Sequence, residues 1–480
     1  MMEVGNMDHS MRLLFLPTRR NMEGEFFCNI DVALNRKKIV RDKLDQLGID
    51  YVDIDFLNDE GLLFNGMDAD RVAEYAREKH VDAVFAPHVN FGSEDAVAKV
   101  AKRLDKPLLL WGPRDDAPDA MGHRCTDSQC GLFATGKVLR QHKVPFTYMT
   151  NCTVDDPTFE RTLRQFLAVA QVVKALRNLR LGQISVRPEP FWSVKSNELQ
   201  LLERFGIEVV PTTLIELQAI FQDTLKNENK ILDDMIASYR SRYAIHVEED
   251  RLRNSAALTR SIRRWADEMK LDAIASACWG PMRELGNVAS CFSFSELTEE
   301  KLPVICENDI HGAITSVIAQ AATRWTCPSF FADLTIRHPE NDNAELFWHC
   351  GVFPSSLARK DQRSSVEPNF DEKRPCVAHF ELKKGDVTLC RFDCSEDQYS
   401  LLMMEGKVID GPITEGTYGW IEFKDWPKIE HKFVTGPYIH HCVGVYGHIA
   451  EILYEACKYI PGLKPDFTEP TEEELAARLR

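Results

Sequence analysis

Residues 81–111, VDAVFAPHVNFGSEDAVAKVAKRLDKPLLLW, contain the pattern that decides the fold class. The apolar runs at 81–87 and 107–111 are typical of buried strands, and residues 94–104 between them have the apolar spacing of a helix. Short strands that alternate with amphipathic helices indicate a parallel sheet covered by helices. This stretch therefore predicts an α/β fold.

The same alternation continues on both sides of this stretch. In the first part of the chain we expect further strands at 12–17, 51–54 and 144–149, and helices at 30–47, 69–80, 129–142 and 157–176. A second alternating block follows, with strands expected at 183–186, 207–211, 273–277, 303–307 and 330–334. No G-x-G-x-x-G motif follows the first strand, so the pattern gives no support for a dinucleotide site.

After residue 336 the helical spacing gives way to strand-like runs separated by polar turns. We expect strands at 345–350, 376–382, 387–392, 399–409 and 418–423, and one closing helix over 442–459. The chain is thus predicted to form two doubly wound parallel-sheet domains, at 1–178 and 179–335. A β-rich C-terminal domain with a closing helix is expected at 336–480.

Composition and charge exclude several classes of protein. The 480 residues carry a formal charge of −16, which argues against a nucleic-acid binder or a protein of anionic membranes. No run approaches the about 18–20 apolar residues of a membrane helix, and the N-terminus lacks the apolar core of a signal peptide. The 14 cysteines are scattered, which favours reduced thiols and a cytoplasmic location.

Three potential ligands end three successive apolar runs. Glu307 follows 303–306, Asp333 follows 330–332, and His349 follows 346–348. Because ligands bind outside the carboxyl ends of strands in wound α/β sheets, these side chains are expected to converge. The pair His440-His441, in the loop GPYIHH, is a further candidate.

Each of these residues also has a plainer explanation. A carboxylate at a strand end is often a turn residue or a helix cap, and Glu307 could cap a helix that starts near His311. A histidine beside Trp348 is more often packed in a core than bound to a metal. If a metal binds, carboxylates with imidazole suit Mn²⁺, Mg²⁺ or Co²⁺, and the absence of thiolate ligands argues against structural zinc.

The order Glu307, Asp333, His349, His441 resembles the metal site of the L-fucose/L-arabinose isomerases, which are metal-dependent aldose–ketose isomerases. The strings that carry the resemblance are CEND at 306–309, FWHCG at 347–351 and GPYIHH at 436–441. The resemblance implies that Glu307 binds the metal and serves as an acid/base, and that Asp333 is the second acidic ligand, as in the fucose branch. His441 matches the distant metal histidine, and His349 matches a ligand of the arabinose branch.

We predict that Arg19, His440 and Trp348 bind the substrate. Arg19 lies in Thr18-Arg19-Arg20, where the family has a substrate-recognising arginine, and His440 precedes the ligand, where the family has a substrate contact. In that family the first domain completes the active site of a neighbouring subunit. The resemblance therefore implies a homo-oligomer, a hexamer or trimer, with its active site at the subunit interface.

The implied reaction interconverts a free aldose and its 2-ketose through a metal-bound cis-enediol, with Glu307 and Asp333 as the catalytic carboxylates and Mn²⁺ as the favoured ion. A neutral fucose- or arabinose-like sugar is the default substrate. An anionic sugar becomes plausible if two of Arg19, Arg20, Arg114 and Arg124 face the pocket. The alternatives are a sugar-binding protein without catalysis, a metal-dependent hydrolase or lyase on the same ligands, and a non-catalytic subunit.

Overall fold

The computed structural model describes residues 9–22, 27–368 and 375–480, and they form two compact units. The N-terminal unit holds the described residues up to 174, together with 454–460 and 473–480. The second unit holds residues 175–453 and 461–472. Within the described ranges, no helix combines the length and apolar character that a bilayer crossing requires.

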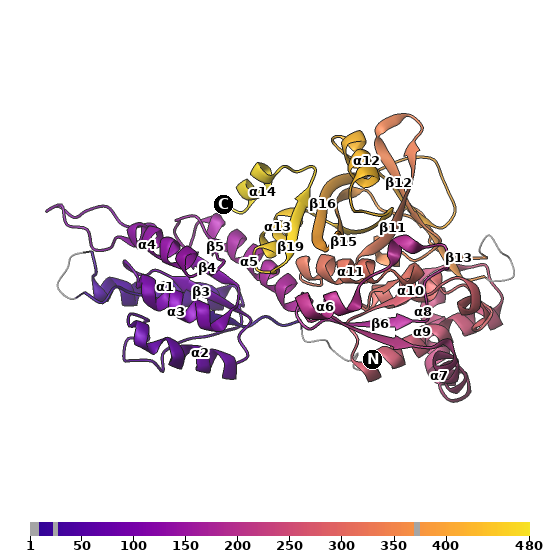
Figure 1. Ribbon diagram of the computed structural model, residues 1–480, viewed down its shortest axis with the longest axis horizontal. Helices are drawn as coiled ribbons and strands as arrows, with labels where there is room; N and C mark the ends of the chain where they lie inside the picture. Colours follow the sequence, from indigo (N-terminus) through magenta and orange to yellow (C-terminus); the bar gives the residue numbers. More distant parts are fainter. Residues whose placement is uncertain (1–8, 23–26, 369–374) are drawn as a thin grey trace. The chain divides into compact units, whose positions relative to one another are not determined.

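The N-terminal unit contains one parallel sheet with the strand order β2-β1-β3-β4-β5. It belongs to the indigo and purple part of the chain in Figure 1, where β3, β4 and β5 are labelled. Its strands are β1 (Leu13–Phe15), β2 (Tyr51–Val52), β3 (Ala83–Pro87), β4 (Leu108–Trp111) and β5 (Thr147–Tyr148). Its helices are α1 (Ile30–Gln46), α2 (Ala69–Glu78), α3 (Glu94–Leu104), α4 (Ser128–Gln141) and α5 (Pro157–Leu176). The strands predicted from the apolar runs are therefore present, in shortened form.

Side chains alternate between two cores on the two faces of this sheet. Leu14 and Leu16 belong to the core that α2, α3 and α4 cover, whereas Leu13 and Phe15 belong to the core formed with α1 and α5. A strand that is buried on both faces reads as a continuous apolar run, which is why the sequence shows no alternation at these positions.

The second unit begins with a parallel sheet of order β10-β9-β6-β7. Its strands are β6 (Arg180–Ile184), β7 (Glu208–Thr212), β9 (Ala273–Ser276) and β10 (Val304–Ile305). The helices are α6 (Glu198–Phe205), α7 (Leu214–Asn227), α8 (Asn229–Arg242), α9 (Glu249–Met269), α10 (Cys291–Glu299) and α11 (Ile310–Ala322). Helix α11 is buried along its whole length, so it forms the centre of this unit.

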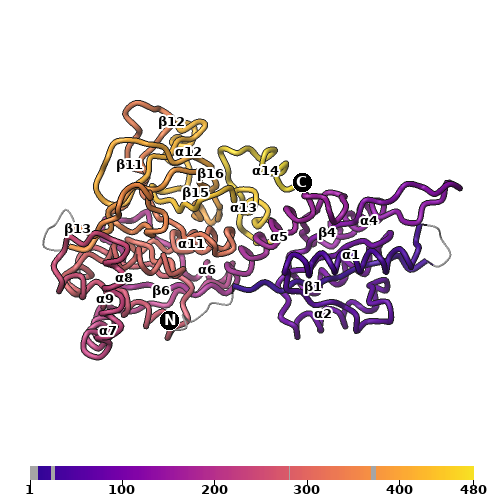
Figure 2. The backbone as a smooth tube through the Cα atoms, turned by 180° about the vertical axis from the view of Figure 1, so that it is seen from behind, coloured from indigo at the N-terminus to yellow at the C-terminus, as the bar shows by residue number. Residues whose placement is uncertain are grey.

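The rest of the second unit is a ten-stranded sheet, mostly antiparallel, with the order β19-β16-β15-β18-β11-β12-β17-β14-β13-β8. Figure 2 labels β11, β12, β15 and β16 in the orange part of the chain. An additional pairing of β16 with β17 closes six of these strands into a barrel-like ring. The ring strands are β11 (Phe330–His338), β12 (Asn341–His349), β15 (Gly385–Ser395), β16 (Gln398–Ile409), β17 (Thr417–Glu422) and β18 (His441–Tyr446). The remaining elements of this unit are β8 (Ala244–Ile245), β13 (Ser365–Glu367), β14 (Val377–Glu381), β19 (Leu463–Phe467), α12 (Trp426–Thr435) and the first half of α13 (Ala450–Cys457). The second half of α13 and nearly all of α14 (Glu472–Arg478) belong to the N-terminal unit.

The structure thus confirms a mixed α/β fold with parallel sheets and a β-rich C-terminal part. Two local predictions were wrong. The strand expected at 330–334 belongs to the barrel-like sheet rather than to the second parallel sheet, because β11 pairs antiparallel with β12 and β18. The closing helix expected over 442–459 is instead strand β18 followed by the short helix α13.

The apolar residues from 442 onward fit either structure, and tertiary packing decides between them. A Cβ atom at Gly444 would lie 2.1 Å from the ring of Phe330, so only glycine allows β18 to lie this close to β11. Gly447, with φ of +100°, then turns the chain out of the strand.

Candidate metal centre

Strand pairing places Asp333 beside His441. Asp333 on β11 is directly opposite His441 on β18, although 108 residues separate them in the sequence (441 − 333). Cross-strand neighbours have their side chains on the same face of a sheet. The antiparallel register therefore holds a carboxylate and an imidazole together on a rigid support.

Glu307 reaches the same place from the parallel sheet. It follows β10 in the short turn Cys306–Asn308, where Glu307 has φ of +62° and Asn308 has φ of +60°. Such left-handed conformations are costly for residues other than glycine and need support from their surroundings. Asn308 supplies that support, because its Nδ2 donates to the carbonyl of Ile184 at 3.0 Å and its Oδ1 accepts from Gln183 at 2.9 Å.

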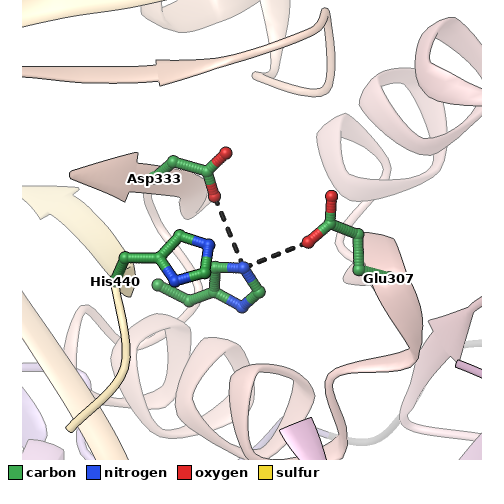
Figure 3. A group of neighbouring side chains, drawn as sticks. Glu307, Asp333 and His440 are labelled. Atoms are coloured by element: carbon green, nitrogen blue, oxygen red, sulfur yellow. Dashed lines mark ion pairs between the residues drawn. The ribbon is translucent and has the colours of Figure 1, made fainter. Parts of the chain in front are cut away.

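The side chains of Glu307, Asp333, His440 and His441 offer ligand atoms that all lie within 4.8 Å of one another. His441 Nε2 is 3.1 Å from Glu307 Oε2 and 3.5 Å from Asp333 Oδ1 (Figure 3). Glu307 and His441 are buried, Asp333 is half-buried, and His440 is exposed. The group therefore has one open side, where His440 lies.

These atoms have the properties of an ion-binding site. Glu307 Oε2, Asp333 Oδ1 and His441 Nε2 are all buried, and none has a well-aligned hydrogen-bond partner among the described residues. Unsatisfied buried polar atoms are rare, and several that face one another need an explanation. Two carboxylates and an imidazole fit a divalent ion such as Mn²⁺, which would be ligated by these three atoms.

Asp309 orients the imidazole of His441. The Asp309 Oδ2 atom accepts a hydrogen bond from His441 Nδ1 at 2.9 Å, so Nδ1 carries a proton and the Nε2 lone pair is directed at the carboxylates. Asp309 Oδ1 also caps helix α11 by accepting from the backbone N–H of Gly312 at 2.9 Å. One carboxylate thus fixes both a candidate ligand and the start of the central helix.

A buried ionic network extends this support. Both terminal nitrogens of Arg391 bind Asp309, and Arg391 Nε donates to Asp393 Oδ2 at 2.9 Å. Asp393 Oδ1 in turn accepts from His311 Nδ1 at 2.9 Å. All four residues are at most 5% exposed, so breaking any one pair would leave a charge uncompensated in the interior.

His349 lies next to the group but bonds differently. Its Nδ1 accepts a hydrogen bond from the backbone N–H of Cys350 at 2.9 Å, whereas its buried Nε2 has no aligned partner among the described residues. A backbone N–H can only donate, so the neutral ring carries its proton on Nε2. This arrangement favours His349 as a hydrogen-bond donor toward the carboxylates, and its predicted role as a metal ligand stays a prediction.

The electrostatics of the group favour charged side chains. Burial lowers the pKa of His441, but the hydrogen bond to Asp309 and the close carboxylate of Glu307 outweigh burial and raise the pKa to about 9. Burial also raises the pKa of Glu307, but the adjacent His441 imidazole outweighs burial and lowers the pKa. Without a metal, the His441 imidazolium thus lies between the carboxylates, in the position that a cation would take.

The three predicted substrate residues have different surroundings. His440 belongs to the group of ligand atoms described above. Trp348 packs against the cluster of Leu346, Tyr418 and Trp420 in the barrel-like sheet, and its ring nitrogen donates to the carbonyl of Glu415. The substrate roles of both residues stay predictions.

Arg19 lies in the N-terminal unit, where it is 4% exposed and pairs with Glu60. Its guanidinium also lies over the ring of Phe64 at 3.7 Å. Arg20 and Arg124 pair with Glu94 and Asp127. Three of the four arginines considered for an anionic sugar are therefore already matched with carboxylates.

Asp309 and Arg391 were not among the residues predicted to form the site. Asp309 is only two residues after Glu307 and is followed by a helix, so its capping position could have been read from the sequence. Arg391 is a charged residue in the middle of the apolar run at 387–392, and a buried charge requires a partner. Its partner lies 82 residues away, and the sequence gives no sign of which acid it is.

Comparison with known proteins relates the chain to sugar isomerases. Residues 22–177 match the family described as fucose/sulfoquinovose isomerase, N-terminal domain. The sulfoquinovose isomerase of Priestia megaterium is 27% identical over 379 residues, which cover 78% of this chain and 83% of that protein. The sulfoquinovose isomerase of Alkalicoccus urumqiensis is 28% identical over 334 residues, 69% of this chain and 73% of that protein. The similarity therefore extends well beyond residues 22–177.

Proposed function

We propose that the chain is an isomerase of the fucose/sulfoquinovose isomerase family and that it interconverts an anionic aldose and its 2-ketose at the group formed by Glu307, Asp333 and His441. The observation that carries this proposal is the convergence of three buried, unsatisfied ligand atoms from Glu307, Asp333 and His441. A sugar-binding protein without catalysis would have no need for them.

The reaction moves one proton between two neighbouring carbons of the sugar and another between their oxygens. A bound divalent ion would polarise those oxygens and stabilise the negative charge that develops on them. Glu307 and Asp333 are both within reach of such a C1–C2 unit, and we assign them the proton transfer from C2 to C1. The lowered pKa of Glu307 keeps it ionised, as a base must be before it accepts a proton.

The neighbouring histidines have supporting roles in this proposal. His441 presents its Nε2 lone pair to the ion because Asp309 holds the opposite nitrogen. His349 donates from Nε2 and steadies the negative charge on the carboxylates or on the sugar oxygens. His440, on the open side, contacts the sugar as it enters.

Several finer points belong to the same proposal. We infer that the ion is Mn²⁺ and that the protein is cytoplasmic. We also infer three domains, at 1–178, 179–335 and 336–480, of which the first two are doubly wound around their parallel sheets. A homo-oligomer, hexamer or trimer, with Arg19 at the substrate is inferred from the resemblance. Trp348 is also assigned to the substrate. Light scattering of the purified protein measures the oligomeric mass, and a monomer would contradict this part.

An isotope experiment tests the mechanism. Reaction in deuterated water with Mn²⁺ should place deuterium on C1 of the ketose, because a carboxylate proton exchanges with solvent before it is returned. Complete transfer of the original C2 hydrogen to C1 would instead indicate a hydride shift and would contradict proton transfer by Glu307 and Asp333.

A substitution tests the assignment of the base. E307Q keeps the shape of the side chain but cannot accept the proton, so kcat should fall by about 100- to 10,000-fold. E340Q, in the exposed turn between β11 and β12, is the matched control and should retain wild-type kcat. An E307Q enzyme with near wild-type kcat would refute the assignment.

A further inference from the structure

A large cavity lies at the carboxyl edge of the parallel sheet in the second unit. Its volume is about 740 Å³, within the range of small-molecule sites. The segment after β6 forms much of its wall, and Trp279 after β9 and Asn308 after β10 complete the edge. Ligands of open α/β sheets bind at this edge. Because Asn308 directly follows Glu307, the cavity adjoins the candidate metal centre.

An aromatic contact links the cavity to the metal group. The ring of Phe191 lies 5.2 Å from the ring of Trp279, which lines the cavity, and 6.5 Å from the ring of His440. His440 is the exposed member of the group of ligand atoms. Phe191 therefore lies between the exposed member of the metal group and a residue of the cavity wall.

Two cations line this cavity, and neither has a carboxylate partner among the described residues. The guanidinium of Arg187 lies 4.7 Å from the ring of Trp192, and Lys195 Nζ lies 5.1 Å from the same ring. Arg187 Nη1 donates to the carbonyls of Pro188 and Glu189 at 2.9 and 2.6 Å, which fixes the guanidinium plane. Its Nε and Nη2 donate to no other described residue.

Several other arginines of the second unit pair with carboxylates. Arg242, Arg253 and Arg260 bind Glu296, Asp233 and Glu228. In a chain with a net charge of −16, a half-buried arginine with free donors at a cavity is available for an external anion. The planar fork of the guanidinium matches two oxygens of an oxyanion.

We propose that Arg187 and Lys195 bind the anionic substituent of the substrate, while Glu307, Asp333 and His441 hold its C1–C2 end. This inference rests on the proposed function and adds the residues that set substrate class. Glu189 and Glu198 also line the cavity, so its formal charge is balanced. A balanced site favours a singly charged sulfonate or carboxylate over a phosphate dianion, because the second charge would meet the two glutamates.

The first test compares sugars that differ only in charge. With Mn²⁺ present, kcat/KM is measured for a hexose with a 6-sulfonate, a 6-phosphate or a neutral C6, using the wild type, R187Q and K195Q. The ratio of kcat/KM for the sulfonated over the neutral sugar should fall by about 10- to 100-fold in R187Q, as expected for loss of a charge-assisted bond. K226Q, on the exposed face of α7, should leave the ratio unchanged.

A binding measurement separates this inference from the proposed function. Calorimetry of the metal-free protein with the 6-sulfohexose should give binding that weakens in R187Q and with added salt, whether or not any isomerisation occurs. If the wild type binds this sugar but converts none, the proposed function fails and the anion site stands. If R187Q and K195Q bind and convert the sulfonated sugar as the wild type does, or if the wild type prefers the neutral or phosphorylated sugar, the anion site is refuted.

Discussion

Replacing Asp309 by asparagine removes one charge from the interior while keeping the shape of the side chain. Asp309 binds His441 Nδ1 at 2.9 Å and both terminal nitrogens of Arg391, and it is fully buried. The D309N side chain can still cap helix α11 through its Oδ1. Its amide N–H groups, however, then face donors on His441 and Arg391.

The size of the effect follows from these contacts. Breaking one side of a buried ion pair typically costs about 3–5 kcal/mol in the free energy of unfolding. Arg391 keeps Asp393 as a second partner, so the lower end of that range applies. For the metal, the loss of the carboxylate that orients a ligand histidine typically weakens affinity by about 10- to 100-fold.

Two assays separate these effects. Urea unfolding of the metal-free protein gives the stability loss, and calorimetric titration with Mn²⁺ at a temperature where the variant is folded gives the affinity. D393N is the matched control, since it weakens the same network at Arg391 and His311 without touching His441. We expect D393N to lose stability but to keep its Mn²⁺ affinity. Equal Mn²⁺ affinity of D309N and the wild type would refute the role assigned to Asp309.

Three further predictions concern other parts of the second unit. H441N should weaken Mn²⁺ binding by more than the about 10- to 100-fold that is typical for loss of a residue supporting a ligand. H349N should lower kcat and leave the Mn²⁺ affinity nearly unchanged. Equal losses of affinity in calorimetric titrations of the two variants would make His349 a ligand. G444A should lower the unfolding free energy by about 1–3 kcal/mol in urea, since its Cβ would strike a ring of β11, and unchanged stability would contradict this packing. Burial and the charge of Glu430 raise the pKa of Glu345 from 4.5 to about 7, so the folded protein holds this proton more tightly than the unfolded chain does. The contribution of Glu345 to the free energy of unfolding is therefore present below about pH 4.5 and is lost as the pH rises to 7. E345Q should reduce the dependence of the unfolding free energy on pH in this range. An identical pH dependence in E345Q and the wild type would rule the effect out.

The parallel sheets could be predicted because their signal is local. Buried strands such as β3 and β4 are runs of apolar residues, and the helix between them carries its own spacing. Strand β18 was missed because its apolar residues also fit a helix, and the choice depends on Phe330, which is more than 100 residues away (444 − 330 = 114). Long-range packing of this kind overrides local preference and leaves no trace in a single window.

The candidate site also has features that the sequence predicts and features that depend on the fold. Glu307 and Asp333 could be selected because each ends an apolar run, and His441 because it lies in the loop GPYIHH; both are features of one segment at a time. What distinguishes His441 from His349 is the partner of the Nδ1 atom, a carboxylate for one and a backbone N–H for the other. That difference favours a lone pair on Nε2 in His441 and a proton on Nε2 in His349. A sequence names the imidazoles, but only the fold shows that Asp309 orients one of them.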